Sequence, residues 1–209
     1  MRAGRALMPN VTRIAVFGTE STGKTTLARR LAAHFDEPWS PEFVREFWDA
    51  RGGKIDATDL DAIARGQIAQ EEAAAAKARC VVFCDTELIT CTLWDDLLFP
   101  GACPAWVRAA AERRARDFAL YLLCDTDVPF TPDPQRCFPD APARERARRV
   151  WREALGSRGL PCEEIQGDWA ARECAASAAV EKILAGLGAT AGRGGFCRKL
   201  LRAVAKHRA

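Results

Sequence analysis

The sequence predicts an α/β fold in which a parallel sheet carries helices on both of its faces. Three apolar runs of strand length, residues 14–17, 80–84 and 118–124, carry this prediction. Segments with the apolar spacing of helices follow the first run and separate it from the others. Strands that alternate with helices are typical of parallel sheets, because each helix returns the chain to the edge at which the next strand begins.

The first strand leads into a phosphate-binding motif. Residues 18–25 read Gly-Thr-Glu-Ser-Thr-Gly-Lys-Thr and match the pattern G-x-x-x-x-G-K-[ST]. Glycine at both ends lets successive N–H groups point at a polyphosphate, and the helix that follows adds its positive end. Lys24 is expected to reach the β- and γ-phosphates and the Thr25 hydroxyl to bind Mg²⁺. The motif predicts a P-loop NTPase or kinase-like fold that binds ATP, with contacts from Gly18, Glu20, Ser21, Thr22, Gly23, Lys24, Thr25 and Thr26.

The composition is that of an ordinary globular chain. The 209 residues are 48% hydrophobic and 28% charged, which is enough for one domain with a core of its own. No run of about 18 apolar residues is present, and the first ten residues lack the apolar centre of a secretory signal, so we expect a cytoplasmic protein with no membrane partner. The formal net charge of +3 is too small to indicate nucleic acid.

The nine cysteines are scattered along the chain without a C-x-x-C pair. An odd number in a chain without a secretory signal favours free thiols in a reducing cytosol over a disulfide framework. The chain has only two histidines, and their spacing to cysteine is not that of a zinc site.

The segment after the first helix interleaves charged and aromatic residues. On a helix, Glu42, Arg45 and Glu46 share one face, whereas Phe43 and Phe47 share another. Two interpretations remain open: a substrate-binding cluster beside the P-loop, or a surface ion-pair face above a core stripe.

A long helix is expected next, from a capped start at residues 56–59 to about Ala78, with Leu60 and Ile63 facing inward. Gln67 is expected on its exposed face.

Asp85 ends the second apolar run, and Thr86 and Glu87 follow it. Open α/β sheets bind ligands at the carboxyl ends of their strands. A carboxylate there can hold Mg²⁺ or accept the proton of an attacking hydroxyl. An aspartate in this position also serves commonly as a helix cap, but beside a P-loop we expect Asp85 to be functional.

The third apolar run ends at Asp125 and is followed by a proline-rich stretch, residues 126–136, which we expect to form a lid. A basic helix comes after it. Arg136 and Arg144 are expected to reach the phosphates when the lid closes. The alternative is a solvated arginine face that pairs with neighbouring glutamates.

The last predicted strand covers residues 160–165, and a helix over 170–187 closes the domain, which we place at residues 11–187. Residues 186–195 are rich in glycine and indicate a linker to a basic tail, so that 188–209 is expected to be flexible. A helix that binds a phosphate or a partner is the alternative.

Taken in this order, the motifs resemble the ribosylnicotinamide kinase domain of the NadR family, a P-loop, AAA-like ATPase group. The similarity covers roughly residues 11–187. It rests on residues 18–25, 42–48, 85–87, 125–133 and 167–172, read in that order. The most specific combination is G-T-E-S-T-G-K-T-T-L at 18–27, P-E-x-x-R-E at 41–46, D-T-E at 85–87 and D-T-D-V-P-F at 125–130.

The resemblance implies transfer of the ATP γ-phosphoryl group to the 5′-hydroxyl of nicotinamide riboside, which would give nicotinamide mononucleotide for NAD biosynthesis. Lys24 and Asp85 would then be the catalytic residues, and Thr25 and Asp85 the Mg²⁺ ligands. The turn from Gly167 to Trp169 would face adenine, so that Trp169 joins the ATP contacts. Residues that would contact the riboside or the lid around it are Glu42, Arg45, Glu46, Glu87, Asp127, Pro129 and Asp133.

The chain also departs from the family pattern. It carries no adenylyltransferase domain before the first strand and no helix-turn-helix, which predicts a stand-alone kinase. Asp133-Pro134 stands where members commonly have Asp-Gly, and Phe130 where they have Trp. A kinase for another nucleoside, or a P-loop ATPase with a regulatory or switch role, are the alternatives. A nucleic-acid partner is not expected, because no second basic stripe carries interleaved aromatics, and the sequence gives no signal for an oligomeric state.

Overall fold

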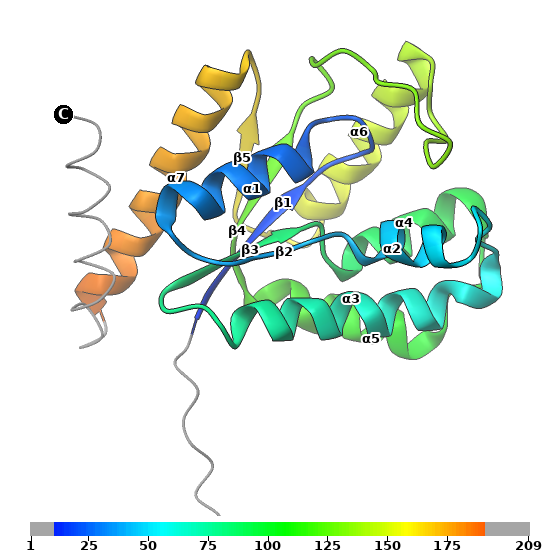
Figure 1. The fold of residues 1–209 in the computed structure, drawn as a ribbon, viewed down its shortest axis with the longest axis horizontal. Coiled ribbons are helices and arrows are strands. Elements are labelled where there is room, and N and C mark those ends of the chain that lie inside the picture. Colours follow the sequence, from blue (N-terminus) through cyan, green and yellow to red (C-terminus); the bar gives the residue numbers. More distant parts are fainter. Residues whose placement is uncertain (1–10, 191–209) are drawn as a thin grey trace, which may run out of the picture.

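The structure, a computed structural model, describes residues 11–190 and the side chains of residues 11–187. Its core is a five-stranded sheet of order β2-β3-β1-β4-β5 in which every pairing is parallel (Figure 1). The elements are β1 (Thr12–Phe17), α1 (Lys24–Phe35), β2 (Trp39–Ser40), α2 (Phe43–Ala50), α3 (Leu60–Ala75), β3 (Val81–Asp85), α4 (Leu88–Leu98), α5 (Ala105–Arg114), β4 (Phe118–Cys124), α6 (Ala141–Gly156), β5 (Cys162–Ile165) and α7 (Trp169–Thr190). The parallel sheet of the sequence prediction is confirmed.

Strand β1 lies at the centre of the sheet, between β3 and β4. Val16 pairs with Asp85 of β3, and Phe17 pairs with Leu123 of β4. Because the strands are parallel, their carboxyl ends meet at one edge of the sheet. The P-loop begins at that edge. Asp85 lies there as the last residue of β3, and Asp125 as the first residue after β4.

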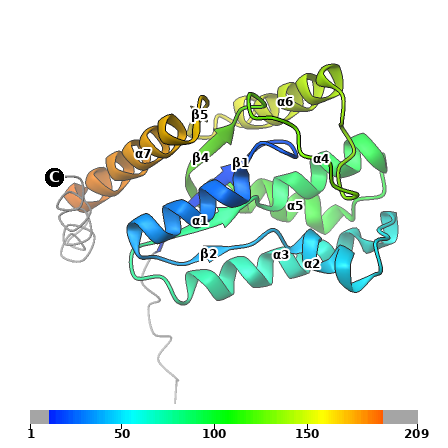
Figure 2. The same cartoon turned by 45° about the horizontal axis from the view of Figure 1, so that its top comes forward.

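Helices cover both faces of the sheet (Figures 1 and 2). On one face, α1 and α7 pack on outward side chains of the strands such as Ile14 and Val16. On the other face, α3, α4, α5 and α6 bury Ala15, Phe17 and Val82. The strands are therefore buried on both sides, which explains why they read as continuous apolar runs rather than as an alternating pattern.

The helix predicted from residues 56–59 to Ala78 is shorter and begins with a 3₁₀ turn, Ala57–Asp59. Asp56 and Asp59 form a reciprocal capping box at that turn, and Leu60 and Ile63 are buried as predicted. The placement of Gln67 on the exposed face is wrong. Its side chain is buried, accepts a hydrogen bond from the Phe43 backbone N–H at 2.9 Å, and so joins α3 to α2.

The cysteine expectation holds only in part. Among the described residues, Cys84, Cys91, Cys103, Cys124, Cys137, Cys162 and Cys174 are free thiols. Cys80 is disulfide-bonded, so the prediction of free thiols throughout is wrong at this position.

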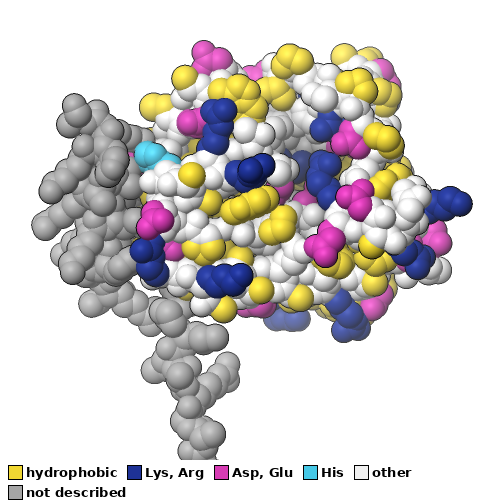
Figure 3. Space-filling model, in the orientation of Figure 1, with side chains coloured by type: hydrophobic (Ala, Val, Ile, Leu, Met, Phe, Trp, Pro, Cys, Tyr) yellow, Lys and Arg dark blue, Asp and Glu magenta, His cyan; other side chains and the backbone are white. Residues whose placement is uncertain are grey.

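The C-terminal predictions are only partly covered by the described residues. Helix α7 runs to Thr190, so the first residues of the predicted linker are helical. The basic tail that the sequence predicts after residue 190 lies outside the described part of the chain. Within residues 11–190, no helix has the length and apolar character needed to cross a membrane. Basic and acidic side chains are mixed on the face that Figure 3 shows.

Candidate active site

The P-loop, residues 18–25, connects β1 to α1 and depends on its two glycines. Gly18 has a φ of 138° and Gly23 a φ of 81°, conformations that side chains with a Cβ rarely adopt. A Cβ on Gly18 would lie 2.9 Å from the carbonyl oxygen of Cys124, and one on Gly23 would lie 2.6 Å from Cη2 of Trp169. The loop is therefore held between β4 and the start of α7.

Lys24 lies back along this loop. Its Nζ donates a hydrogen bond to the carbonyl oxygen of Thr19 at 2.8 Å, and the Thr22 hydroxyl donates to the same oxygen at 2.9 Å. Both side chains are buried. The ammonium group is thus already inside the loop whose N–H groups form the anion-binding nest.

Asp85 lies across the sheet edge from the P-loop. The Thr25 hydroxyl donates a hydrogen bond of 2.6 Å to Asp85 Oδ2. Burial, reinforced by the negative charge of Glu42, raises the pKa of Asp85 to about 6. The next residue, Thr86, has a φ of 67°, and backbone conformations of this kind in β-branched residues concentrate at functional sites.

These two side chains fit a magnesium ion. Asp85 Oδ1 is fully buried and has no hydrogen-bond partner among the described residues, and the Thr25 hydroxyl lies beside the other oxygen. Mg²⁺ usually takes one or two protein oxygens and completes its shell with water and phosphate oxygens. The described residues hold no cluster of three or more His, Cys, Asp or Glu side chains suited to a metal, so a site built on Thr25 and Asp85 would be of this kind.

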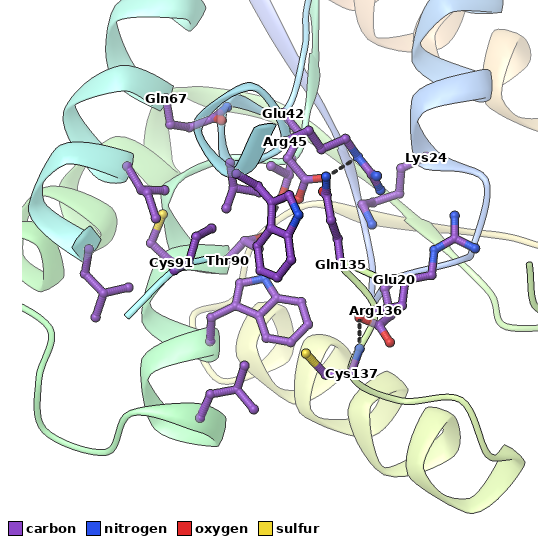
Figure 4. Close-up of a pocket in the computed structure, with 18 of the residues that line it drawn as sticks. Glu20, Lys24, Glu42, Arg45, Gln67, Thr90, Cys91, Gln135, Arg136 and Cys137 are labelled. Atoms are coloured by element: carbon purple, nitrogen blue, oxygen red, sulfur yellow. Dashed lines mark hydrogen bonds and ion pairs between the residues drawn. The ribbon is translucent and has the colours of Figure 1, made fainter. Parts of the chain in front are cut away.

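A cavity of about 240 Å³ opens beside the P-loop, and we call it the acceptor cavity (Figure 4). Lys24 and Glu20 lie at its P-loop side, and Gln67, Thr90 and Cys91 lie at its other side. The lining comes from α2, α3, α4, α6, the P-loop and the β4–α6 connection. Its side chains are Glu20, Lys24, Glu42, Val44, Arg45, Trp48, Ile55, Leu60, Ile63, Gln67, Thr86, Glu87, Thr90, Cys91, Trp94, Leu98, Phe99, Gln135, Arg136, Cys137 and Trp151, with Gly18 completing it.

The charged triplet predicted on α2 is divided by the structure. Glu42 and Arg45 line the acceptor cavity and form an ion pair of 3.2 Å. Glu46 is exposed, does not line the cavity, and accepts a hydrogen bond from Gln70 at 2.8 Å. The structure thus brings Glu42 and Arg45 together at the cavity and leaves Glu46 at the surface.

The segment that contains the predicted lid, residues 125–140, is docked on the P-loop; we call this whole segment the lid. The Glu20 carboxylate accepts hydrogen bonds from the backbone N–H groups of Cys137, at 2.9 Å, and of Phe138. The Ser21 hydroxyl accepts from the Thr131 N–H at 3.0 Å. Two P-loop side chains, which a consensus motif leaves undefined, thus hold the lid over the acceptor cavity.

Of the arginines predicted in the lid and the basic helix, Arg136 and Arg144 hydrogen-bond to the P-loop. Arg136 donates to the Ser21 hydroxyl at 3.1 Å, and Arg144 donates to the Ser21 carbonyl at 3.2 Å. Arg148 pairs instead with Asp125 at 2.7 Å. The predicted lid arginines are therefore the pair that lies near the phosphate-binding loop, while the next turn of α6 is anchored to the end of β4.

Arg172 is a functional candidate that the sequence interpretation missed. It is fully buried and donates to the Thr22 carbonyl of the P-loop at 3.1 Å and to the Asp125 carbonyl at 3.1 Å. It also pairs with the carboxylate of Asp127. Arg172 thereby fixes the P-loop to the end of β4. No local sequence pattern indicated this role, because Arg172 lies far along the chain from both of these segments.

Of the remaining predicted residues, Asp127, Pro129 and Trp169 do not line the acceptor cavity, whereas Glu87 does. Asp127 accepts from the Gly167 N–H as well as from Arg172, and Pro129 is exposed. Trp169 packs on Gly23, and the guanidinium of Arg30 lies 5.1 Å from the centre of its ring. Glu87 does line the cavity, and burial raises the pKa of its carboxyl to about 8.

Residues 13–172 match the AAA domain family. Among solved structures, the chain is similar to a NadR protein in complex with NAD and AMP-PNP, with 22% identity and a TM-score of 0.63 over 83% of this chain and 49% of that one. It is also similar to a NadR protein in complex with NR, with 23% identity and a TM-score of 0.64 over 83% and 50% of the two chains.

A thymidylate kinase from Ehrlichia chaffeensis is a further similar structure, with 15% identity and a TM-score of 0.53 over 77% of this chain and 90% of that one. These likenesses establish a P-loop kinase-like fold, as the sequence predicted. The chain spans about half the length of the NadR chains that it matches. No curated protein sequence matches it.

Proposed function

The chain belongs to the AAA domain family, and from this premise we propose that it is an ATP-dependent kinase that phosphorylates the 5′-hydroxyl of nicotinamide riboside. The product would be nicotinamide mononucleotide, an intermediate of NAD biosynthesis. The resemblance of its motifs to the ribosylnicotinamide kinase domain, and its likeness in fold to NadR proteins solved with AMP-PNP and with NR, support this proposal.

One observation carries it. The acceptor cavity begins at Gly18 and Lys24 of the P-loop and extends to a group of tryptophans. A switch ATPase needs only a water beside the γ-phosphate, whereas a kinase needs a second site for the molecule that attacks it. A cavity of about 240 Å³ that adjoins the P-loop would supply such a site.

ATP would bind with its phosphates in the P-loop. The backbone N–H groups between Gly18 and Thr25 and the amino end of α1 would surround the phosphate oxygens, and Lys24 would leave the Thr19 carbonyl to reach the β- and γ-phosphates. Thr25 and Asp85 would hold Mg²⁺, which supplies positive charge to the β- and γ-phosphate oxygens when bound.

The acceptor hydroxyl would enter from the cavity side. Phosphoryl transfer is mostly positioning and electrostatic stabilisation, so the side chains that fix the ribose are expected to matter as much as any base. The ion-paired Glu42 and Arg45, which line the cavity, would bind ribose hydroxyls. Asp85 would accept the proton of the attacking hydroxyl or orient that hydroxyl toward the γ-phosphate.

The lid would then separate the reaction from water. Its bonds to Glu20 and Ser21 close the P-loop side of the cavity, and Arg136 and Arg144 bring two guanidinium groups to that side. Positive charge there favours the spread negative charge of the transition state. Exclusion of water favours transfer to the riboside over hydrolysis of ATP.

The test is ATP turnover in Mg²⁺ with and without nicotinamide riboside, with mass spectrometry of the products. We expect ADP formation to depend on the riboside and a phosphorylated riboside to appear in equal amount. Turnover that depends on a different nucleoside from a panel would retain the kinase and replace its acceptor. Turnover independent of every acceptor would overturn the kinase and favour the switch ATPase.

A further inference from the structure

Helix α2 forms one wall of the acceptor cavity, although it is short. Val44 and Trp48, which are four residues apart, line the cavity from one face of the helix. Glu42 and Arg45 line it at the amino end of α2 (Figure 4). None of the eight residues of the helix is buried. A helix of this length is marginal by itself in water, so neighbouring elements must hold the wall in place.

The side chain of Phe43 lies directly on Gly66 of α3. A Cβ built on Gly66 would overlap the Phe43 ring at Cδ1, Cε1 and Cζ. The ring also lies beside that of Phe47, one turn further along α2, with ring centres 6.0 Å apart. Phe43 therefore fills the space that any other side chain at position 66 would take.

The backbone gives no reason for a glycine at position 66. Gly66 lies in the middle of α3, and its φ is not positive, so any residue can adopt its helical conformation. Glycine is unfavourable inside a helix, because it loses more conformational freedom on folding than other residues do. The reason that the structure supplies is the space for the Phe43 ring.

The next residue of α3 fixes the same point of α2 by a hydrogen bond. Gln67 Oε1 accepts from the Phe43 N–H at 2.9 Å, and Gln67 Nε2 donates to the buried Glu71 at 3.2 Å. Glu71 in turn pairs with Arg114 of α5 at 2.9 Å. The amino end of α2, which carries Glu42, is therefore held by both the backbone and the ring of Phe43.

We propose that Gly66 is a positioning residue of the acceptor site. Its missing side chain seats Phe43 and thereby places the cavity-lining residues of α2 against the acceptor. Neither Gly66 nor Phe43 lines the cavity, so the effect passes through the position of the helix rather than through contact with the ligand. The inference rests on the proposed function and makes a residue outside the cavity a determinant of affinity for the acceptor.

The experiment is Gly66→Ala, with the KM for nicotinamide riboside and the KM for ATP measured separately. The added methyl group should displace Phe43 and α2 with it, so the KM for the riboside should rise about 10-fold or more. The KM for ATP should change less than twofold, because the P-loop is held by β4 and α7 instead. A general loss of structure would not separate the two constants.

Gly156→Ala is the matched control. Gly156 is the last residue of α6, and a Cβ there would meet no atom within 4 Å. The same exchange in a helix should therefore leave both KM values unchanged. Thermal melting of both variants checks that they fold.

Phe43→Ala tests the contact from the other side and creates no overlap. It should raise the KM for the riboside and leave the KM for ATP unchanged, because α2 loses the ring that seats it. In that background, adding Gly66→Ala should change the riboside KM less than twofold, since no ring remains to be displaced. An unchanged riboside KM in Phe43→Ala, or effects of the two substitutions that multiply, would overturn the inference.

Calorimetric binding of nicotinamide riboside separates this inference from the proposed function. If the unchanged protein binds the riboside but transfers no phosphoryl group, and Gly66→Ala weakens binding about 10-fold, the inference stands and the kinase falls. If the kinase acts on the riboside but Gly66→Ala keeps its KM, or raises the KM for ATP equally, the inference is overturned and the kinase stands. Failure to bind any nucleoside of a panel overturns both.

Discussion

The two ends of the candidate site are built in opposite ways. The phosphate end consists of consecutive residues, 18–25, whose backbone and few charged side chains are locked by neighbours such as Thr19 and Asp85. The acceptor end is assembled from side chains of four helices and the lid, contributed by residues between Glu42 and Trp151. The phosphate end needs a single geometry, because it binds the polyphosphate of ATP, which is common to all ATP-dependent enzymes. The second can change its specificity one side chain at a time, because no single stretch of the chain determines it.

Asp85→Asn is expected to have the largest effect on activity, because Asp85 lies where the phosphate end and the acceptor end meet. We expect kcat to fall by about 10³-fold or more while ATP still binds, since the amide keeps the shape but can neither take the proton nor hold Mg²⁺ as tightly. Steady-state turnover and equilibrium binding of ATP measure the two effects. Unchanged turnover would remove Asp85 from the mechanism.

Arg172→Met tests whether the phosphate end is a rigid unit. Removing the buried guanidinium costs about 1–3 kcal/mol of the free energy of unfolding, because the carbonyls of Thr22 and Asp125 lose their donor, whereas the exposed Asp127 carboxylate can be solvated by water. Denaturant unfolding and the KM for ATP should both change.

Arg30→Met is the matched control, since the Arg30 side chain is 48% exposed and pairs with Glu173 at the surface. It should cost about 0–1 kcal/mol. Equal destabilisation by the two variants would contradict the anchoring role of Arg172.

Trp48→Ala tests whether the acceptor end can be changed without affecting the binding of ATP. Stacking on an aromatic side chain is worth about 1–3 kcal/mol per base, so the KM for the riboside should rise about 10-fold or more. The KM for ATP should stay unchanged, because Trp48 lines the cavity from α2 and lies outside the P-loop motif. A parallel rise in both constants would show that the two ends are not separable.

Glu46→Gln is expected to have the smallest effect. The resemblance assigns Glu46 to the riboside, whereas the structure places it at the surface, bonded to Gln70. We expect kcat/KM for the riboside to change less than twofold, measured in parallel with Glu42→Gln, which should reduce it more strongly. A large loss in Glu46→Gln would restore the assignment that follows from the resemblance.

The sequence predicted the parallel sheet and the P-loop because both are local patterns. Buried strands such as 80–84 appear as apolar runs, and the motif at 18–25 carries its own backbone requirements. The place of Asp85 followed from the end of a strand. These predictions needed no knowledge of which helix packs against which strand.

What the sequence did not predict depends on long-range packing. Gln67 sits in a polar position of a helix, yet α2 covers it. Arg172 and Trp151 look like ordinary members of helices until α7 and α6 are placed against the sheet edge. A glutamine or an arginine is buried only when distant residues supply its partners, and those partners are invisible in a local window.

The position of β1 has a consequence for the synthesis of the chain. The strand that carries the P-loop leaves the ribosome first, but its two neighbours in the sheet follow only at residues 81–85 and 118–124, and the guanidinium that holds the Thr22 carbonyl only at residue 172. The nascent chain therefore carries a complete phosphate motif long before it has a nucleotide site. Contacts of such high sequence separation make folding slow and leave apolar strands exposed meanwhile. A chain truncated before Arg172 would keep the motif and lose the binding.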